Sequence, residues 1–315
     1  MQKVIDFEYI INVLEKEGVK GISESDFKPH ESISVNNYVF YINKRNLKII
    51  LRVGHDQHDI PTYEKIDFIF GFFRKHFFPV PKTIVSGRVL CKDYIKRPFF
   101  VQELVEADDL FKVGSMHEYY PHLAEILSRL HQIELEGFGY IVGDGEEYRG
   151  RYKSWYNYLR IEIKKALDKL LKNECLTEGI YEKYSGLFAD LLKKYRRIIN
   201  KTPQKFLHGD AAPGNFLADK KEKKIIAILD VDYAQVGDPA WEFAGQRYAS
   251  EHLLRPYIKA CEKVNEDFDE EEFRLRITIY NPIKKLIIAA AWTKKNKSKI
   301  QGYFDEIDEM ISGLL

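Results

Sequence analysis

The stretch from Phe206 to Ala244 constrains the possible folds of this chain more than any other. Within it, a short apolar run is followed by a charged loop and then by Ile225–Val231, which is apolar and rich in β-branched residues. Two apolar segments on either side of a charged turn are typical of a β-hairpin. If a four-residue turn spans Lys221–Lys224, Asn215 faces Asp230 across the two strands.

Three oxygen-bearing side chains gather in this stretch, because Asp210 lies one loop before the hairpin. Carboxylates that are brought together repel each other and lose hydration, so such a cluster needs a cation or a shared proton. The Asn215 amide and the Asp230 carboxylate suit Mg²⁺, which takes its remaining ligands from water and substrate phosphates. Asp210 can accept the proton of a hydroxyl group, which completes the parts needed for phosphoryl transfer. Asp210 can also act as a nucleophile that forms an aspartyl-phosphate, although Asn215 and Asp230 favour direct transfer.

A longer pattern of motifs surrounds these residues. His-Gly-Asp-x-x-x-x-Asn at His208–Asn215 is followed by a strand ending in Leu-Asp and by Gly-Asp-Pro at Gly237–Pro239. This combination resembles the aminoglycoside phosphotransferase family of small-molecule kinases. The resemblance implies a protein-kinase-like fold in which Asp210 is the catalytic base and Asn215 and Asp230 are the metal ligands.

Three further residues of the stretch have simpler interpretations. We expect His208 to be a hydrogen-bonded structural histidine rather than an acid or a base. Asp238 precedes a proline and lies four residues before Glu242, which is typical of a turn and helix-entry residue. Asp232 adds a carboxylate near Asp230, and the sequence leaves its role open.

Length and composition narrow the class of protein. With 315 residues, 45% of them hydrophobic and 31% charged, the chain is that of a globular protein long enough for two lobes. A net charge of +1 gives no field that would attract nucleic acid, so we expect no nucleic-acid partner. The three widely spaced cysteines favour neither a zinc site nor a redox motif, and they fit a cytoplasmic location. We expect no signal peptide and no membrane association, because Leu286–Trp292 is too short to span a bilayer.

The N-terminal third has the pattern of a small sheet with helices. Apolar spacing predicts a helix over Phe7–Glu17 that ends at Gly18. Alternating and continuous apolar residues between Val39 and Val53 predict a β-hairpin. A helix over 61–76 and strands over 83–90 and 98–105 are expected to follow.

The family resemblance implies that this small lobe binds the phosphates of a nucleotide. Arg52, near the end of a predicted strand, would pair with those phosphates, which an arginine can bind through two parallel hydrogen bonds. Glu64, on the following helix, is the expected partner of Arg52, like the ion pair of a kinase small lobe. The structural alternative for Arg52 is an edge-strand arginine in solvent.

Two other parts of the small lobe are expected to contact the nucleotide. The turn that would cover the phosphates lacks glycines, so Ser34 and its polar neighbours would bind them through backbone amides and hydroxyl groups. An ordinary serine-rich turn is the alternative at this place. The backbone of Glu103 and Val105, in the hinge between lobes, would hydrogen-bond the purine.

The rest of the chain is mainly helical. Helices are predicted over 117–131, 155–170, 181–199, 241–249, 253–264, 270–285 and 287–292, with a polar loop over 144–152. The acidic runs 262–272 and 305–309 are interpreted as a solvated face, with a wall for a cationic substrate as the alternative. The predicted fold class is α+β, a bilobal protein-kinase-like fold. Residues 1–106 would form the nucleotide-binding lobe with its hinge, and 107–315 the catalytic and substrate-binding lobe.

The resemblance implies an enzyme with Mg²⁺ as cofactor and ATP or GTP as phosphoryl donor. Its acceptor would be a hydroxyl group of a small molecule, in the first place an aminoglycoside-type antibiotic, which implies antibiotic resistance. A metabolic kinase that acts on choline, a sugar or an amino alcohol is the alternative. A nucleotide-binding pseudokinase without turnover is a further one, which only the glycine-poor loop favours. A protein kinase is disfavoured because no activation-loop stretch separates Asp230 from Gly-Asp-Pro, and the sequence leaves monomer or dimer open.

Overall fold

The structure, a computed structural model, describes residues 5–30, 37–44, 46–54, 63–144, 147–245, 250–292 and 300–315. The chain divides into two compact units, each built from three segments. The first unit contains 1–119, 143–148 and 213–232, and the second contains 120–142, 149–212 and 233–315. The prediction divides the chain once, near residue 106, whereas each compact unit consists of three segments that alternate along the sequence with those of the other unit. The functional boundary between two lobes remains a prediction.

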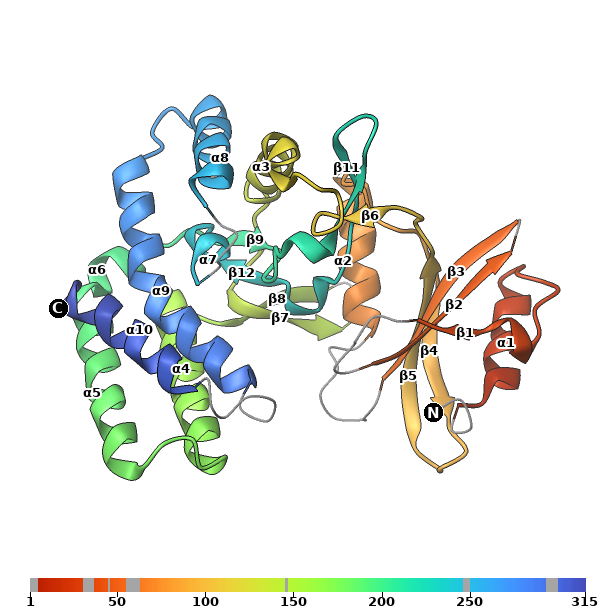
Figure 1. Ribbon diagram of the computed structural model, residues 1–315, viewed down its shortest axis with the longest axis horizontal. Helices are drawn as coiled ribbons and strands as arrows, with labels where there is room; N and C mark the ends of the chain where they lie inside the picture. Colours follow the sequence, from red (N-terminus) through yellow and green to blue (C-terminus); the bar gives the residue numbers. More distant parts are fainter. Residues whose placement is uncertain are drawn as a thin grey trace. The chain divides into compact units, whose positions relative to one another are not determined.

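The first unit contains a five-stranded antiparallel sheet in the order β1-β2-β3-β5-β4 (Figure 1). Its strands are β1 Lys28–Pro29, β2 Asn37–Lys44, β3 Leu47–Gly54, β4 Thr83–Leu90 and β5 Lys96–Glu103. The predicted hairpin is confirmed as β2 and β3, which pair along their whole length. Alternating side chains of the sheet, among them Phe40, Leu51 and Val101, pack with residues of helix α1 into one hydrophobic core.

Two helices accompany this sheet, α1 over Phe7–Lys16 and α2 over Tyr63–Lys75. The Asp6 carboxylate accepts a hydrogen bond of 3.1 Å from the Tyr9 N–H, which caps the start of α1. Gly18 follows the end of α1 with a φ of 84°, a conformation in which a residue without Cβ is favoured. The predicted helix that ends at Gly18 is therefore confirmed. Helix α2 confirms the helix predicted over 61–76, of which 61 and 62 lie outside the described residues.

A second sheet of the first unit has three strands in the order β11-β10-β6. Its strands are β6 Asp108–Asp109, β10 Phe216–Asp219 and β11 Lys224–Ile228. Short 3₁₀ helices in the described part of the chain are η2 Glu24–Asp26, η3 Met116–Glu118, η4 Pro213–Asn215 and η5 Val231–Tyr233. The hairpin predicted from the central stretch is present as β10 and β11, although β11 ends before the predicted Val231.

The register of this hairpin differs from the prediction by one residue. Leu217 pairs with Ala227 and Phe216 with Ile228, and the turn covers 220–223 rather than 221–224. The Asp219 carboxylate explains the earlier turn, because its Oδ1 accepts hydrogen bonds of 2.8 and 2.9 Å from the two N–H groups at 221 and 222. Next to the turn the pairing is two residues from the predicted one, and a register shift between Leu217 and Ala218 reduces the difference to one residue.

A four-stranded sheet has the order β8-β7-β12-β9. Its strands are β7 Phe138–Asp144, β8 Glu147–Tyr152, β9 Lys205–Leu207 and β12 Gln235–Gly237. The loop predicted over 144–152 is therefore wrong, because most of it is the edge strand β8. Arg149 and Arg151 are exposed while Gly150 between them is buried, the alternation of a strand with one covered face. A Cβ atom at Gly150 would lie 2.2 Å from the Phe138 nitrogen, so close backbone approach requires this glycine.

The other regular elements described in the second unit are helices. Its helices are α3 Tyr120–Leu130, α4 Trp155–Lys172, α5 Glu178–Lys194, α6 Arg196–Ile199, α7 Ala240–Phe243, α8 Glu251–Val264, α9 Glu270–Trp292 and α10 Ile300–Ser312. Helix α9 packs against α4, α7 and α10, and α3 packs against α8. The two helices predicted over 270–292 are one helix that contains Pro282, and α10 was not predicted.

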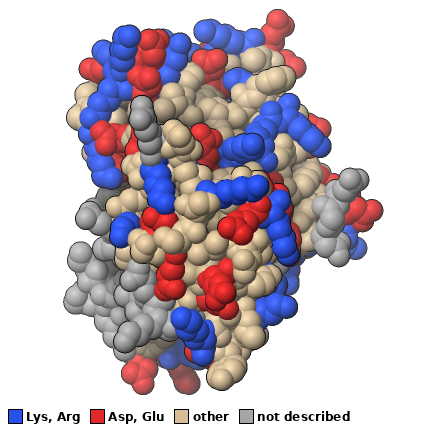
Figure 2. Space-filling model, turned by 90° about the vertical axis from the view of Figure 1, so that its right-hand side faces the viewer, with Lys and Arg blue, Asp and Glu red and all other residues tan. Residues whose placement is uncertain are grey.

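The near-zero net charge of the chain is reflected in the distribution of charged side chains on the surface. Figure 2 shows basic and acidic side chains interspersed over the face that it displays. In the part of the chain that the structure describes, no helix combines the length and the apolar composition needed to cross a bilayer.

Candidate active site

The predicted metal ligands lie at one end of the β10–β11 hairpin, both in the first unit. Asn215 ends the 3₁₀ helix η4, and its C=O accepts a hydrogen bond of 2.8 Å from the Leu229 N–H. Asn215 is thus opposite Leu229 rather than Asp230, which corrects the predicted pairing by one residue. Asp230 follows directly, so the hairpin still brings the amide residue and the carboxylate residue to the same end.

Asp230 has an unusual backbone conformation, with a φ of 53° in the left-handed region. Aspartate tolerates this region better than most residues, but the conformation is strained, and such residues are concentrated at functional sites. The Asp230 side chain is 42% exposed, and its Oδ1 lies 3.9 Å from Nη1 of Arg52. Because this ion pair is long and partly solvated, it contributes little to stability, and ligand contacts can replace it.

Arg52 lies on β3 of the five-stranded sheet, as predicted. Its predicted partner Glu64 is exposed on α2, and no ion pair joins the two among the described residues. The apolar face of α2 determines which side of the helix is covered, and the neighbours Tyr63 and Lys65 lie on that side. The predicted Arg52–Glu64 pair is thus replaced by a pair between Arg52 and Asp230.

Lys65 is a residue that the sequence reasoning missed. It is 6% exposed, and its Nζ donates a hydrogen bond of 3.1 Å to the C=O of Asp232. Burial lowers the pKa of Lys65 to about 8, and the Asp232 carboxylate opposes that shift. The signal in the sequence was a lysine one turn before Ile69 on the apolar face of the helix. A cation from α2 therefore lies beside the loop that follows Asp230.

The predicted hinge contacts become more specific in the structure. The Glu103 N–H already donates a hydrogen bond of 2.9 Å to the C=O of Lys82, and the Val105 C=O accepts one of 3.1 Å from the Ala107 N–H. The prediction of purine binding therefore narrows to the C=O of Glu103 and the N–H of Val105. Ser34, predicted to bind phosphate, lies outside the described residues.

The predicted base Asp210 lies in the second unit, on the loop that follows strand β9. His208 is fully buried, and its Nδ1 accepts a hydrogen bond of 3.3 Å from the Asp210 N–H, as a structural histidine would. Gly209 has a φ of 83°, and a Cβ atom there would lie 1.9 Å from the C=O oxygen of Tyr233. Packing therefore requires a glycine at the middle position of the His-Gly-Asp sequence.

The backbone of this loop is held by a carboxylate that the sequence reasoning did not assign to the site. Glu242, on α7, accepts hydrogen bonds of 3.1 Å from the His208 N–H and 2.8 Å from the Gly209 N–H. Hydrogen bonds to an ionised carboxylate are among the stronger ones in proteins. In the sequence, Glu242 is recognisable as an acidic residue soon after Gly-Asp-Pro. The sequence analysis used Glu242 only to interpret Asp238 as a helix-entry residue.

Asp238 has the predicted helix-entry role and a larger one. Its Oδ1 accepts a hydrogen bond of 3.0 Å from the Ala240 N–H at the start of α7. Its Oδ2 accepts one of 2.8 Å from the Tyr280 hydroxyl and lies 3.0 Å from Nε of Arg276. Burial raises the pKa of Asp238, and Arg276 opposes that shift. Asp238 thus connects α7 to α9 inside the second unit.

The donor set of the first unit fits magnesium. Asn215 and Asp230 supply one amide oxygen and one carboxylate, the hard ligands that Mg²⁺ prefers. No group of three or more His, Cys, Asp or Glu residues that could hold a metal occurs in the described ranges. A metal that takes most of its ligands from water and phosphates does not need such a group.

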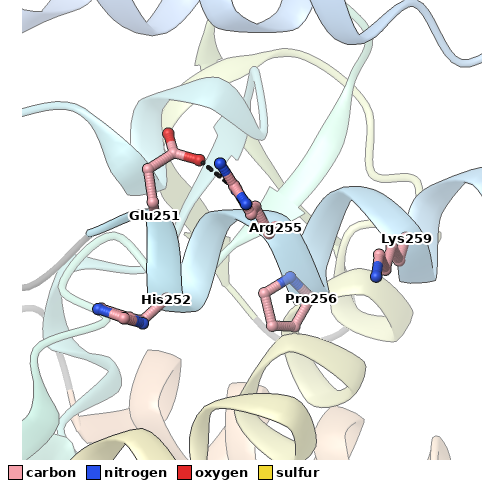
Figure 3. A pocket seen from close by; sticks show the side chains of 5 residues that line it. All are labelled: Glu251, His252, Arg255, Pro256 and Lys259. Atoms are coloured by element: carbon pink, nitrogen blue, oxygen red, sulfur yellow. Dashed lines mark hydrogen bonds and ion pairs between the residues drawn. The ribbon is translucent and has the colours of Figure 1, made fainter.

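A surface pocket occurs on a different element, helix α8. Glu251, His252, Arg255, Pro256 and Lys259 line it (Figure 3). None of the residues predicted to bind nucleotide, metal or acceptor lines this pocket, and we assign it no role in the chemistry.

Comparison with known structures shows what the geometry resembles. A thermostable mutant of aminoglycoside phosphotransferase APH(4)-Ia in ternary complex with AMP-PNP and hygromycin B matches with a TM-score of 0.69 and 16% identity, over 96% of this chain and 98% of that one. The GDP and kanamycin complex of APH(2")-IIia matches at 0.67 and 12%, over 98% and 100%. The choline kinase LicA of Streptococcus pneumoniae matches at 0.65 and 14%, over 97% and 99%. At these identities the similarity shows the fold alone, and it confirms the predicted fold class.

Sequence comparison gives two findings. Histidine–tRNA ligase of Streptococcus equi subsp. zooepidemicus (strain MGCS10565) is 25% identical over 244 residues, which are 76% of this chain and 54% of that protein. The chain thus spans about half the length of the curated relatives it matches, and such a match does not transfer the ligase activity. The family model of the phosphotransferase enzyme family matches residues 27–274. This range includes the hairpin, the His-Gly-Asp loop and the Gly-Asp-Pro turn, so the chain belongs to the phosphotransferase enzyme family.

Proposed function

We propose that this protein transfers the γ-phosphoryl group of ATP or GTP to a hydroxyl group of a small molecule. The observation that carries the proposal is the placement of three motif residues in a member of the phosphotransferase enzyme family. Asp210 follows β9, Asn215 precedes β10, and Asp230 follows β11. These residues supply one base and two metal ligands, the parts that phosphoryl transfer requires.

Each residue has a defined task in this proposal. Asp210 accepts or orients the proton of the acceptor hydroxyl, and Glu242 holds the backbone that presents it. Asn215 and Asp230 bind Mg²⁺, which when bound neutralises the charge of the phosphates. Arg52 lies beside Asp230 and stabilises the negative charge of the transferred group. Positioning and charge neutralisation supply most of the rate enhancement.

The hinge accepts either purine nucleotide in this proposal. Contacts through the C=O of Glu103 and the N–H of Val105 use the backbone alone, so side chains do not select the base. Proteins of the same fold have been solved with AMP-PNP and with GDP, which supports both donors.

The first acceptor class to test is the aminoglycoside-type antibiotics. Two proteins of the same fold have been solved with hygromycin B and with kanamycin. If the chain uses such an acceptor, expression of the protein confers antibiotic resistance.

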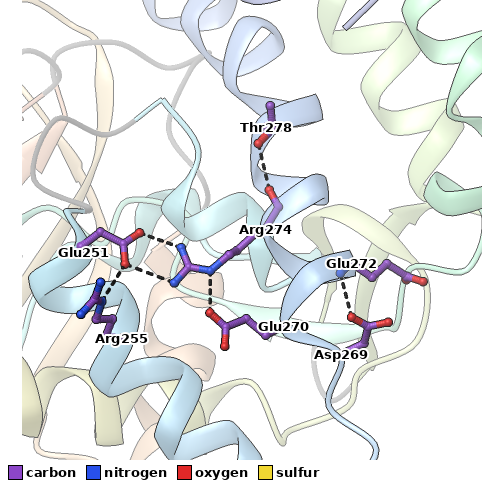
Figure 4. A network of polar contacts seen from close by, with 7 residues as sticks. All are labelled: Glu251, Arg255, Asp269, Glu270, Glu272, Arg274 and Thr278. Atoms are coloured by element: carbon purple, nitrogen blue, oxygen red, sulfur yellow. Dashed lines mark hydrogen bonds and ion pairs between the residues drawn. The ribbon is translucent and has the colours of Figure 1, made fainter. Parts of the chain in front are cut away.

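One observation favours a second candidate, a metabolic kinase for a neutral or singly charged alcohol. A polycationic acceptor needs carboxylates that can pair with it, but several carboxylates of the predicted acidic runs pair with basic side chains of this chain. Glu270 pairs with Arg274 (Figure 4), and Glu272 pairs with Arg276. Arg274 lies 2.6 Å from carboxylate oxygens of both Glu251 and Glu270, and Lys183 lies 2.8 Å from Asp308. An acceptor such as choline, the substrate of a kinase with the same fold, needs fewer free carboxylates.

The test measures ADP or GDP release with panels of aminoglycosides, sugars and amino alcohols. Wild-type protein is compared with Asp210→Ala and with Asp190→Ala, an exposed carboxylate on α5 that serves as the matched control. We expect kcat to fall by about 10²–10⁴-fold in Asp210→Ala, with nucleotide binding retained and the control unchanged. Absence of turnover in the wild type with every acceptor and both nucleotides refutes the proposed function in favour of a nucleotide-binding protein.

A further inference from the structure

A buried carboxylate holds the loop that carries Asp210. Glu242 is 3% exposed, and its two oxygens accept the hydrogen bonds of the His208 and Gly209 N–H groups. Asp210 is the next residue, so any displacement of this carboxylate also displaces Asp210. A buried ionised carboxylate is costly unless a positive charge lies near it, in addition to hydrogen-bond donors.

His131 does not supply that positive charge. Its Nε2 lies 4.0 Å from Glu242, but the ring is buried and its Nδ1 is 2.7 Å from the Tyr257 hydroxyl. Burial lowers the pKa of His131 to about 3, with the positive charge of Lys205 as a smaller cause, so the ring is neutral near pH 7. The Lys205 ammonium is itself 2.8 Å from Glu134.

Lys284, on helix α9, places an ammonium group next to the residue that precedes Glu242. Its Nζ donates a hydrogen bond of 3.0 Å to the C=O of Trp241, the residue before Glu242, and lies 5.1 Å from the centre of the Trp241 ring. Burial lowers the pKa of Lys284, and the carboxylates of Glu242 and Asp210 oppose that shift. The ammonium group is therefore within electrostatic reach of both carboxylates.

The backbone after α7 is shaped around this lysine. Gly245 has a φ of 66°, and a Cβ atom there would lie 3.1 Å from Cβ and Cγ of Lys284. The Gly245 N–H donates a hydrogen bond of 2.8 Å to the side chain of Asn281, three residues before Lys284 on α9. Arg276, a partly buried cation two turns earlier on α9, pairs with Asp238 instead. Lys284 thus lies in a built environment that holds its charge at α7, whose Glu242 binds the His208–Asp210 loop.

We propose that Lys284 is a positioning residue for phosphoryl transfer: its buried ammonium group balances the charges of Glu242 and Asp210 and thereby keeps the His208–Asp210 loop in place. This inference rests on the proposed function of Asp210 as the base. A lysine with only a structural role changes stability when it is replaced. A positioning residue also changes kcat and its pH dependence, while the KM for nucleotide stays the same.

The first experiment compares Lys284→Met with Lys285→Met. Lys285 is adjacent and also buried, but it pairs with Glu306 and lies 5.6 Å from the centre of the Tyr303 ring. Both variants remove one buried ammonium group from the same helix and keep the length of the side chain. We expect Lys284→Met to lower kcat about tenfold or more and to move the acidic limb of the pH–rate profile to higher pH, with nucleotide KM retained. Lys285→Met should keep the wild-type kcat and profile.

Two outcomes of this experiment overturn the inference. One is an equal loss of kcat in both variants, which indicates a general effect of removing a buried lysine. The other is an unchanged pH–rate profile in Lys284→Met.

A second measurement needs neither turnover nor a folded Lys284 variant. The pKa of the Lys284 ammonium group is measured by NMR on protein with ¹³C-labelled lysine, in the wild type and in Asp210→Asn. Because coupling between two titrating groups is reciprocal, loss of the Asp210 carboxylate should lower the pKa of Lys284 further. Asp190→Asn, at an exposed position, should leave it unchanged.

The two possible failures are distinguishable. An equal Lys284 pKa in the wild type and in Asp210→Asn overturns the inference even if the protein proves to be a kinase. Absence of turnover in the wild type refutes the proposed function, while the pKa comparison still decides whether Lys284 and Asp210 are coupled.

Discussion

The loop that carries Asp210 and the loop that carries Asp230 are held in opposite ways. Around Asp210, the supporting carboxylates of Glu242 and Asp238 are buried, and each is bonded to several groups. Around Asp230, the ion pair with Arg52 is 3.9 Å long and the Asp230 side chain is 42% exposed. A group that accepts a proton needs a fixed position, whereas groups that bind metal and phosphates must exchange their partners. The difference in burial therefore agrees with the different tasks proposed for the two loops.

The largest effect on stability is expected from Asp238→Ala, which removes a buried carboxylate that connects α7 to α9. The variant leaves Arg276 without its buried carboxylate and the Tyr280 hydroxyl without its acceptor, so the free energy of unfolding should fall by about 3–5 kcal/mol. Urea unfolding measures this. Glu272→Ala removes the other, partly exposed carboxylate partner of Arg276 and should cost less than about 1 kcal/mol. Equal losses in the two variants would show that burial of Asp238 gives it no special weight.

The next effect concerns pH, through His131. Its pKa is lowered to about 3 in the folded protein from an ordinary value of 6.5, so between these values the unfolded chain binds a proton that the folded one does not. The free energy of unfolding should therefore fall as the pH decreases below about 6.5, by up to about 1.4 kcal/mol per pH unit. Urea unfolding at several pH values should show a shallower dependence in His131→Gln, and an unchanged one in His117→Gln at an exposed position. A slope unaffected by His131→Gln would contradict the burial argument.

A smaller effect is expected from the strained backbone of Asp230. Asparagine tolerates a φ of 53°, so Asp230→Asn should keep the stability within about 0.5 kcal/mol of the wild type. Valine is branched at Cβ, and Asp230→Val should be less stable than Asp230→Asn by about 1–2 kcal/mol. Thermal and urea unfolding compare the two variants. If they are equally stable, the left-handed conformation of Asp230 imposes no requirement on the residue.

The smallest effect on stability is expected from Arg52→Met, which removes the ion pair between Arg52 and Asp230. The free energy of unfolding should change by less than about 1 kcal/mol, because the pair is long and partly solvated. Affinity for the nucleotide should fall about tenfold, since an ionic contact to phosphate is lost. Calorimetric titration with ADP measures the affinity, with Arg88→Met at an exposed position of β4 as the control. A large loss of stability with unchanged nucleotide affinity would reverse the roles assigned to the two loops.

Much of the fold could be predicted from local sequence patterns. The helix ended by Gly18, the β2–β3 hairpin and the β10–β11 hairpin follow from apolar spacing and turn residues, and the structure confirms them. Local patterns failed where one residue decided the outcome. The Asp219 side chain starts its turn one residue early, which shifts the register. The glycine and arginines of β8 have the composition of a loop, but their alternation belongs to an edge strand.

For the candidate site, the sequence by itself determined the motif residues Asp210, Asn215 and Asp230, because their spacing along the chain already implies one loop and one hairpin. Only the tertiary structure decided which residues support them. Arg52 lies near Asp230 instead of Glu64, and Lys65 donates to the loop after Asp230. Glu242 accepts hydrogen bonds from the loop that carries Asp210, and Lys284 donates to the residue before Glu242. Apart from Arg52 on strand β3, these partners come from the helices α2, α7 and α9, and packing of apolar faces determines which side chain of each helix is buried. Local periodicity gives the face of a helix but not the element against which that face packs.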